Sequence, residues 1–240
     1  TYRHETVHQI INFLTHGRPP NLMEVAYCTN TEATEHVASG DEIIITKDQL
    51  SIDWGGCRPI ESLLTEWLTL SHNSKDIMAN LPHCLLTQNL KETKKIGSAR
   101  RKILHNEPSN ESWMFLNLFN PLPMSSPGFL NNPNAQHLQY LEDKQGKDAT
   151  RRFPYGILLS EGGQHTGSHI DFLGTATSVT VHEGTYGFGW IHVRDMGDLD
   201  AWTQDPLSVD VGRMARYVVL HPGQTVYMPS GTIHFIFRKQ

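Results

Sequence analysis

The chain has 240 residues, of which 38% are hydrophobic and 19% are charged, and its formal net charge is −5 at pH 7. These values are typical of a globular protein and argue against one built mainly to bind nucleic acid, and no stretch approaches the roughly 18 consecutive apolar residues that a membrane helix needs. The three cysteines are odd in number, far apart and without a CxxC pair, which favours a reducing, intracellular environment over a disulfide framework or a zinc cluster.

The first half of the chain contains two helical patterns and two strand patterns. Apolar residues at i, i+3, i+4 and i+7 predict an amphipathic helix over 6–17. A second helix is predicted over 58–72, where the apolar residues share one face and Pro59 suits the first turn. Short apolar runs predict strands over 41–48 and 112–119.

Two further segments have a biased composition. Residues 91–102 hold six basic residues and one acidic residue. They fit a contact with nucleic acid or an acidic protein, but a solvated face is the favoured interpretation. Residues 120–152 are rich in Pro, Asn, Ser and Gly, and they predict a long loop around one short helix over 135–143.

After Phe153 the pattern changes to short strands separated by glycine and proline turns, with one helical turn over 196–206. This arrangement is typical of a β-barrel or jelly roll. We therefore predict a mainly β core over 111–240, with the loop-rich insertion over 120–152, and a flanking helical region over 1–110 that packs on it. Three aromatic residues of this half form either a binding wall or, by preference, part of the core: Trp190, Trp202 and Tyr227.

Two ionisable residues, His169 and Asp171, stand one residue apart in a strand-like segment. Because strand side chains alternate, both would point to the same face, which a barrel would close around a pocket. His234 follows the turn residues Pro229 and Gly231 in a PxGxxH sequence and is the candidate third member. Two imidazoles and one carboxylate are the facial triad of non-haem Fe(II) oxygenases, which leaves coordination positions open. The alternative is a hydrogen-bonded core histidine beside a turn-capping aspartate.

Two segments resemble a known family: TGSHIDFLGTATSVTVHEGTYGFGWI, from Thr166 to Ile191, and PGQTVYMPSGTIHFIFR, from Pro222 to Arg238. They look like the JmjC domain of the Fe(II)- and 2-oxoglutarate-dependent oxygenases, and the histone lysine demethylase branch has the nearest pattern. The second segment also fits the broader cupin pattern. The resemblance implies a double-stranded β-helix, which is a jelly roll of the cupin type, with Fe(II) bound by His169, Asp171 and His234.

The resemblance also implies a 2-oxoglutarate site. The family has a Thr three residues before the first ligand, which Thr166 matches, and an Asn on an earlier strand, for which Asn117 is the candidate. Tyr186 stands where the family usually has a Lys, and a phenol forms no ion pair with a carboxylate. Arg238 lies four residues after His234, hence on the same face of a strand, and its guanidinium could bind that carboxylate bidentately. The plain alternatives are strand-end polar groups for Thr166 and Asn117 and a solvated cation for Arg238.

The resemblance thus implies a dioxygenase with Fe(II) and 2-oxoglutarate as cofactors that hydroxylates or N-demethylates a protein. The family suggests a histone tail as the substrate and the nucleus as the location. Direct binding to nucleic acid or a membrane is not expected. A different class of function also fits, a catalytically degenerate JmjC domain that binds chromatin or a protein, and the missing Lys is its best argument. A third interpretation is a cupin that binds a metal for another reaction.

Overall fold

The computed structural model describes residues 2–40, 43–73, 104–105, 114–130, 156–160, 162–163, 165–171 and 175–238. The chain forms two compact units. The first consists of Thr1–Leu50, Ser126–Ala135 and His165–Lys239, and the second of Ser51–Ser125, Gln136–Gln164 and Gln240. The first unit therefore combines the two ends of the sequence, and it contains His169, Asp171 and His234.

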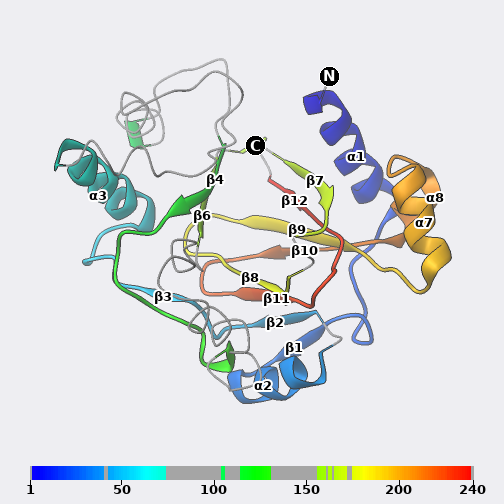
Figure 1. Cartoon of the computed structure of the whole chain (residues 1–240), viewed down its shortest axis with the longest axis horizontal. Helices are drawn as coiled ribbons and strands as arrows, with labels where there is room; N and C mark the ends of the chain where they lie inside the picture. Colours follow the sequence, from blue (N-terminus) through cyan, green and yellow to red (C-terminus); the bar gives the residue numbers. More distant parts are fainter. Residues whose placement is uncertain are drawn as a thin grey trace, which may run out of the picture. The chain divides into compact units, whose positions relative to one another are not determined.

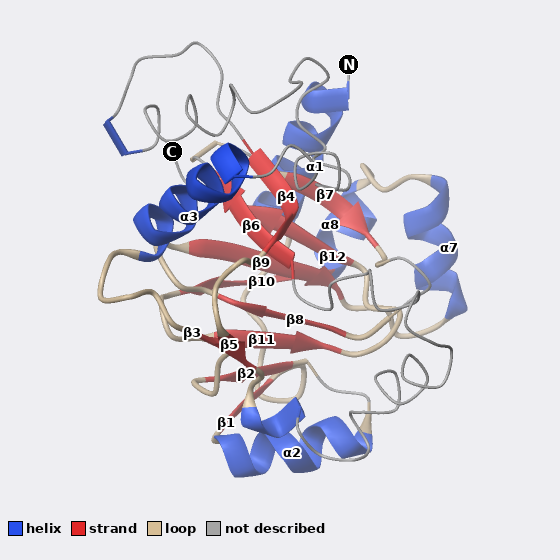
Figure 2. Cartoon of the chain, turned by 60° about the vertical axis from the view of Figure 1, so that its left-hand side comes forward, coloured by secondary structure: helices blue, strands red, loops and turns tan. Residues whose placement is uncertain are grey.

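The first unit contains two four-stranded sheets, which Figures 1 and 2 show from two sides. The strands of one sheet follow the order β1-β2-β11-β8, with bounds Ala26–Cys28, Ile44–Thr46, Thr225–Met228 and Thr177–Thr180. Those of the other follow the order β10-β9-β12-β7, with bounds Ala215–Leu220, Tyr186–Ile191, His234–Phe237 and Thr166–His169. β1 and β2 are parallel, and the other pairs are antiparallel.

The two sheets share one buried apolar cluster. β9 contributes every second residue to it, namely Tyr186, Phe188 and Trp190, and β11 contributes Val226 and Met228. This alternation is what a strand produces when one of its faces is buried. The cluster therefore joins the inward faces of the two sheets.

Three helices pack on the outer face of the second sheet: α1 (Tyr2–His16), α7 (Met196–Gln204) and α8 (Val209–Met214). Phe13 of α1, Val211 of α8 and Phe235 of β12 are fully buried in the second apolar cluster. Gly189 of β9 faces the same cluster, and a Cβ there would stand 2.1 Å from the Phe235 ring. The glycines that alternate with aromatic residues in β9 thus make room for the phenylalanines of β12.

The helix α2 (Asn30–Ser39) packs on β1 and β2, together with the 3-10 turn Gly128–Leu130. A capping box starts this helix, because the Thr29 hydroxyl accepts from the Glu32 N–H while the Glu32 carboxylate accepts from the Thr29 N–H. Gly40 ends it with φ at +90°, in the left-handed region that favours glycine.

In the second unit, the helix α3 (Pro59–Asn73) buries Leu63, Leu64 and Trp67. Two short sheets complete this unit. β3 pairs with β5, over Ser51–Ile52 and Met124–Ser125, and β4 pairs with β6, over Met114–Phe119 and Gly156–Ser160.

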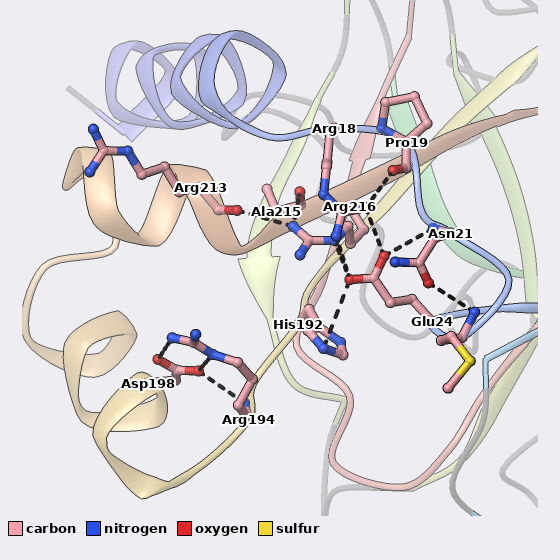
Figure 3. A network of polar contacts seen from close by, with 11 residues as sticks. Arg18, Pro19, Asn21, Glu24, His192, Arg194, Asp198, Arg213, Ala215 and Arg216 are labelled. Atoms are coloured by element: carbon pink, nitrogen blue, oxygen red, sulfur yellow. Dashed lines mark hydrogen bonds and ion pairs between the residues drawn. The ribbon is translucent and has the colours of Figure 1, made fainter.

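A network of ion pairs and hydrogen bonds surrounds Glu24, just before β1 (Figure 3). The Glu24 carboxylate accepts hydrogen bonds from Arg18 and from the Asn21 N–H, and Arg216 Nε of β10 donates to it at 2.8 Å. His192 Nε2 lies 3.9 Å from Glu24 Oε1. Burial alone would raise the pKa of Glu24, but the hydrogen bonds lower that pKa to about 2. The network therefore fixes the N-terminal segment to β10 with a charged carboxylate.

The fold class was predicted in part. The chain is mixed α and β, with mainly antiparallel sheets and five α-helices in the part that the structure describes. A mainly β core of the barrel or jelly-roll type was expected. The described strands form separate sheets and no continuous ring, so a closed barrel is not found among them, and the jelly roll stays a prediction. The predicted helices over 6–17 and 58–72 correspond to α1 and α3, whereas α2 and β1 were not predicted. None of the described helices is long and apolar enough to span a membrane.

Three predictions concern residues outside the described part. They are the basic stretch over 91–102, the short helix over 135–143, and the boundary near 110, since residues 106–113 are not described. These predictions stay predictions. The described start of the 120–152 insertion contains β5 and the turn Gly128–Leu130, and so it has regular structure where a loop was expected.

Candidate metal centre

His169, Asp171 and His234 come together at one end of the second sheet. His169 is the last residue of β7 and His234 the first of β12, and the two are directly paired across the strands. Their ring centroids are 4.2 Å apart. Asp171 Oδ1 lies 3.8 Å from the Nε2 atom of each ring. One ligand atom from each residue lies within 4.8 Å of the others, so this group could hold a metal ion.

Asp171 reaches this position in a different way from the one predicted. The sequence pattern placed His169 and Asp171 on one strand face, but β7 ends at His169 and Asp171 follows it. The Thr177 hydroxyl of β8 donates to Asp171 Oδ2. That bond orients the carboxylate so that its other oxygen faces the two imidazoles.

Backbone carbonyls orient both imidazole rings. His169 Nδ1 lies 2.9 Å from the Gly167 carbonyl oxygen, and His234 Nδ1 lies 3.1 Å from that of Thr232. A carbonyl oxygen only accepts hydrogen bonds, so each Nδ1 carries the proton. In the neutral ring, Nε2 then has the free lone pair that a metal ion binds.

Burial is the main cause that lowers the pKa of His234, and the neighbouring His169 lowers it further. Both effects favour the neutral imidazole that metal binding requires. The side chain of His234 is 6% exposed, whereas those of His169 and Asp171 are 40% and 28% exposed. A ligand or an ion can therefore reach the centre from the side of His169 and Asp171.

A β-bulge in β7 brings Thr166 to the same face as His169. His169 pairs with His234, and Thr166 pairs with Ile236, so two β7 residues lie opposite the single residue Phe235. His234 and Ile236 share a face of β12, and directly paired residues share a face of the sheet. In a regular strand, residues three apart would face opposite ways, and the extra residue of the bulge removes that difference. Thr166 therefore lies on the side of the candidate centre.

Tyr186 and Arg238 meet farther along the same sheet. Arg238 follows β12 and is 8% exposed, so it is buried rather than solvated. Its guanidinium carbon lies 5.2 Å from the centroid of the Tyr186 ring. The Tyr186 hydroxyl is buried and has no hydrogen-bond partner among the described residues. Burial is the main cause that raises the pKa of Tyr186; Arg238 opposes this rise and Asp171 adds to it.

Asn117 lies in β4, in the second unit. Its strand pairs with β6 and has a register shift between Phe115 and Leu118, where Asn117 stands. The side chain of Asn117 lies outside the described part, so its predicted role stays a prediction. The three aromatic residues that could have formed one binding wall lie in different parts of the unit, which favours their interpretation as core residues. Trp190 is in the shared cluster, Tyr227 packs edge-on against Phe129, and Trp202 packs beside α1.

Sequence reasoning did not identify three residues that support the centre: Thr177, Ser168 and Gln9. Thr177 orients Asp171, and Gln9 of α1 is hydrogen-bonded to Ser168, the neighbour of His169. Thr177 had a signal that was available, namely a threonine in the strand that follows the HxD pair. Gln9 had none, because it is far from His169 in the sequence. A scan of the chain against protein-family models gives no match, and neither does a search of the curated proteins.

Proposed function

We propose that the chain is an Fe(II)- and 2-oxoglutarate-dependent oxygenase of the JmjC type that hydroxylates or N-demethylates a protein. The observation that carries the proposal is the group of His169, Asp171 and His234, in which one carboxylate oxygen lies 3.8 Å from both Nε2 atoms. Two imidazoles and one carboxylate suit Fe(II), and they leave positions for a co-substrate and dioxygen. The same ligands also bind other divalent ions, so the donor set alone does not select iron.

The order of the strands supports a double-stranded β-helix for the core. From β7 to β12, the chain passes between the two sheets: β7, β9, β10 and β12 lie in one, and β8 and β11 lie in the other. This exchange between two facing sheets is typical of a jelly roll. His169, at the end of β7, and Thr177, in β8, then act across the two sheets on Asp171 between them.

Tyr186 and Arg238 support a site for the distal carboxylate of 2-oxoglutarate. A carboxylate that leaves water needs charge compensation. Arg238 offers a buried guanidinium beside Tyr186, the position at which the JmjC family usually has a Lys. The buried Tyr186 hydroxyl offers a hydrogen-bond donor that no described residue uses. Thr166 adds a further hydroxyl on the same face of the sheet as His169.

Bound Fe(II) and 2-oxoglutarate would supply the oxidising power to insert one oxygen atom of O₂ into a C–H bond, with succinate and CO₂ as products. The protein contributes the open side of the centre, where His169 and Asp171 are partly exposed. A protein side chain can approach there, and an N-methyl group or an aliphatic carbon would meet the same geometry. The histone tail and the nuclear location come from the resemblance and belong to the proposal.

The decisive experiment measures succinate release from 2-oxoglutarate with Fe(II) and ascorbate, with and without a methyl-lysine peptide. We expect turnover by the wild type and none by His234→Ala, which lacks a metal ligand. If the wild type releases no succinate and its metal-loaded form binds no 2-oxoglutarate by calorimetry, the oxygenase proposal is wrong.

A second candidate function is a binding module without turnover, which the Tyr186 position favours. The family amine is replaced by a phenol whose hydroxyl is buried, and a phenol does not neutralise a carboxylate. In that case the chain would bind a methyl-lysine peptide by calorimetry with an affinity that does not change when 2-oxoglutarate is added. A cupin with another reaction would bind the metal but not 2-oxoglutarate.

A further inference from the structure

The bulge in β7 leaves the backbone irregular immediately before His169. Among the described strands, β7 lies at the edge of its sheet and pairs with β12 alone, and it places Gly167 and Ser168 opposite Phe235. A bulge leaves one residue outside the hydrogen-bond ladder, and its N–H then needs another partner. Whatever holds this segment also sets the position of His169, the next residue.

Gln9 of α1 is that partner. Its Oε1 accepts the Ser168 N–H at 2.8 Å, and its Nε2 donates to Ser168 Oγ at 2.9 Å. One side-chain amide therefore binds one residue of β7 at two points, its backbone N–H and its hydroxyl. Gln9 is only 7% exposed, so losing these bonds would leave buried polar groups unsatisfied.

Trp202 of α7 adds a third bond to the same residue, since its indole Nε1 donates to Ser168 Oγ at 2.8 Å. Two helices thus hold Ser168 from the side opposite the metal centre. Gly167 permits this close approach, because a Cβ there would stand 2.6 Å from Gln9 Oε1. The Gly167 carbonyl also accepts the bond from His169 Nδ1, so the held segment touches the ligand directly.

We propose that Gln9 and Trp202 are positioning residues for metal binding, which act by holding the Gly167–Ser168 bulge that aims His169. This inference rests on the proposed metal site. The ligand set itself is unchanged when Gln9 is lost, but His169 then samples orientations in which its Nε2 no longer converges with His234 Nε2 and Asp171 Oδ1. Metal affinity falls for that reason, and not because the fold is weaker.

The first test is Gln9→Ala beside a matched control, Asn12→Ala. Asn12 also lies on α1 and its amide also binds a distant segment, through one hydrogen bond from its Nδ2 to the Ser208 carbonyl at 2.8 Å. Mn(II) binding to the metal-free proteins is measured by calorimetry, and thermal unfolding by circular dichroism. We expect both variants to unfold at similar temperatures, whereas only Gln9→Ala binds Mn(II) about 10-fold more weakly, as for loss of an outer hydrogen-bond partner of a ligand.

Two further variants make the test specific to the bulge. Gln9→Glu keeps an oxygen that can accept the Ser168 N–H. Its affinity for Mn(II) should therefore stay within about threefold of the wild type, a change in free energy smaller than that of a typical hydrogen bond. Gly167→Ala should push Gln9 away and weaken Mn(II) binding as Gln9→Ala does. In the double variant, the two effects should not add, because they remove the same contact.

Hydrogen exchange in the metal-free proteins gives a second readout. The peptide that contains Ser168 should exchange faster in Gln9→Ala than in the wild type or Asn12→Ala, because its N–H has lost its partner. If Gln9→Ala binds Mn(II) as tightly as the wild type, the positioning role is wrong while the metal site stands. If the wild type binds Mn(II) no better than His169→Ala, the metal site itself is wrong, and the inference fails with it.

Discussion

Asp171 and Glu24 are two carboxylates beside histidine in the same unit, and they differ in the charge that faces them. Glu24 accepts hydrogen bonds from two guanidinium groups and is 7% exposed in its side chain. Asp171 faces two imidazole Nε2 atoms at 3.8 Å and one hydroxyl, and is 28% exposed. A neutral imidazole brings no positive charge to its neighbour. The carboxylate of Glu24 is therefore neutralised by the protein, whereas Asp171 and its two histidines form a group that could hold an added cation.

The difference separates a charged cluster that the protein completes by itself from a group that could hold a metal ion. A buried carboxylate with two arginines is complete by itself, and its removal leaves those cations unpaired. A carboxylate that faces the lone pairs of two neutral imidazoles gains a positive partner there only when a cation binds. The same chemical change at the two carboxylates should therefore have opposite results.

The largest effect is expected from Asp171→Asn. The amide keeps an oxygen for the Thr177 hydroxyl but removes the negative ligand, so the loss of metal affinity should exceed the roughly 100-fold that removal of an outer partner causes. The free energy of unfolding of the metal-free protein should stay within about 1 kcal/mol of the wild type. Mn(II) calorimetry and urea unfolding check the two parts. Undiminished metal binding would show that Asp171 is not a ligand.

The next effect concerns the two arginines that are buried in the described part, Arg216 and Arg238. Arg216 meets Glu24, whereas Arg238 lies over Tyr186. If Arg238 binds 2-oxoglutarate, Arg238→Ala should cost about 2–5 kcal/mol of binding, which is about a 30- to several-thousand-fold rise in the co-substrate constant. Metal content should not change.

Tyr186→Phe is the matched variant for Arg238→Ala. It removes only the proposed hydrogen bond from the Tyr186 hydroxyl to the co-substrate. The co-substrate constant should therefore rise by no more than about 0.5–1.5 kcal/mol in free energy, less than in Arg238→Ala. Succinate release as a function of 2-oxoglutarate concentration measures both variants. If Arg238→Ala turns over like the wild type, another residue holds the distal carboxylate.

Glu24→Gln is the counterpart of Asp171→Asn. It leaves Arg216 buried without its carboxylate, and breaking a buried pair of this kind costs about 3–5 kcal/mol. We expect a large drop in the free energy of unfolding by urea and an unchanged affinity for Mn(II). A variant that keeps wild-type stability would mean that the network in Figure 3 contributes little to folding.

Lowering the pH should also remove the stability that the ionised Glu24 carboxylate contributes to the fold. The pKa of Glu24 is about 2 in the folded protein and about 4.5 when it is unfolded, so the unfolded chain binds more protons between these values. Stability from Glu24 is therefore complete above about pH 4.5 and is lost as the pH falls toward 2, by about 3 kcal/mol in all. The pKa of Asp198 is also lowered to about 2, by its hydrogen bonds to Arg194, so its contribution to the stability of the fold is lost over a similar pH range. The difference between the wild type and Glu24→Gln at each pH isolates the Glu24 part, and a constant difference would contradict the prediction.

The sequence predicts what is local and leaves out what is distant. The HxD spacing and the PxGxxH turn identified His169, Asp171 and His234 as candidate ligands, although Asp171 lies beyond the end of β7 and not on its face. The bulge at Gly167–Ser168 was not predictable, since it depends on the register between β7 and β12. Contacts between residues far apart, such as Gln9 with Ser168 or Glu24 with Arg216, likewise have no local signal. They arise only when the sheets bring the two ends of the chain together.

The smallest effect is expected for an ion pair at the surface. Comparing it with a buried pair tests whether burial or charge causes the loss of stability expected for Glu24→Gln. Arg213 in α8 pairs with Asp210 at 3.0 Å, and the two side chains are 69% and 83% exposed. Water screens such a pair, so Arg213→Ala should change the free energy of unfolding by less than about 0.5 kcal/mol. Arg216→Ala removes the same kind of group three residues later, but it takes away one of the two guanidinium groups that bind the buried Glu24, and should cost about 3–5 kcal/mol. Urea unfolding of the two variants at neutral pH makes the comparison direct, because both lose one guanidinium. Equal losses would mean that charge, and not burial, determines the strength of the network, and the contrast drawn between Glu24 and Asp171 would then lose its physical basis.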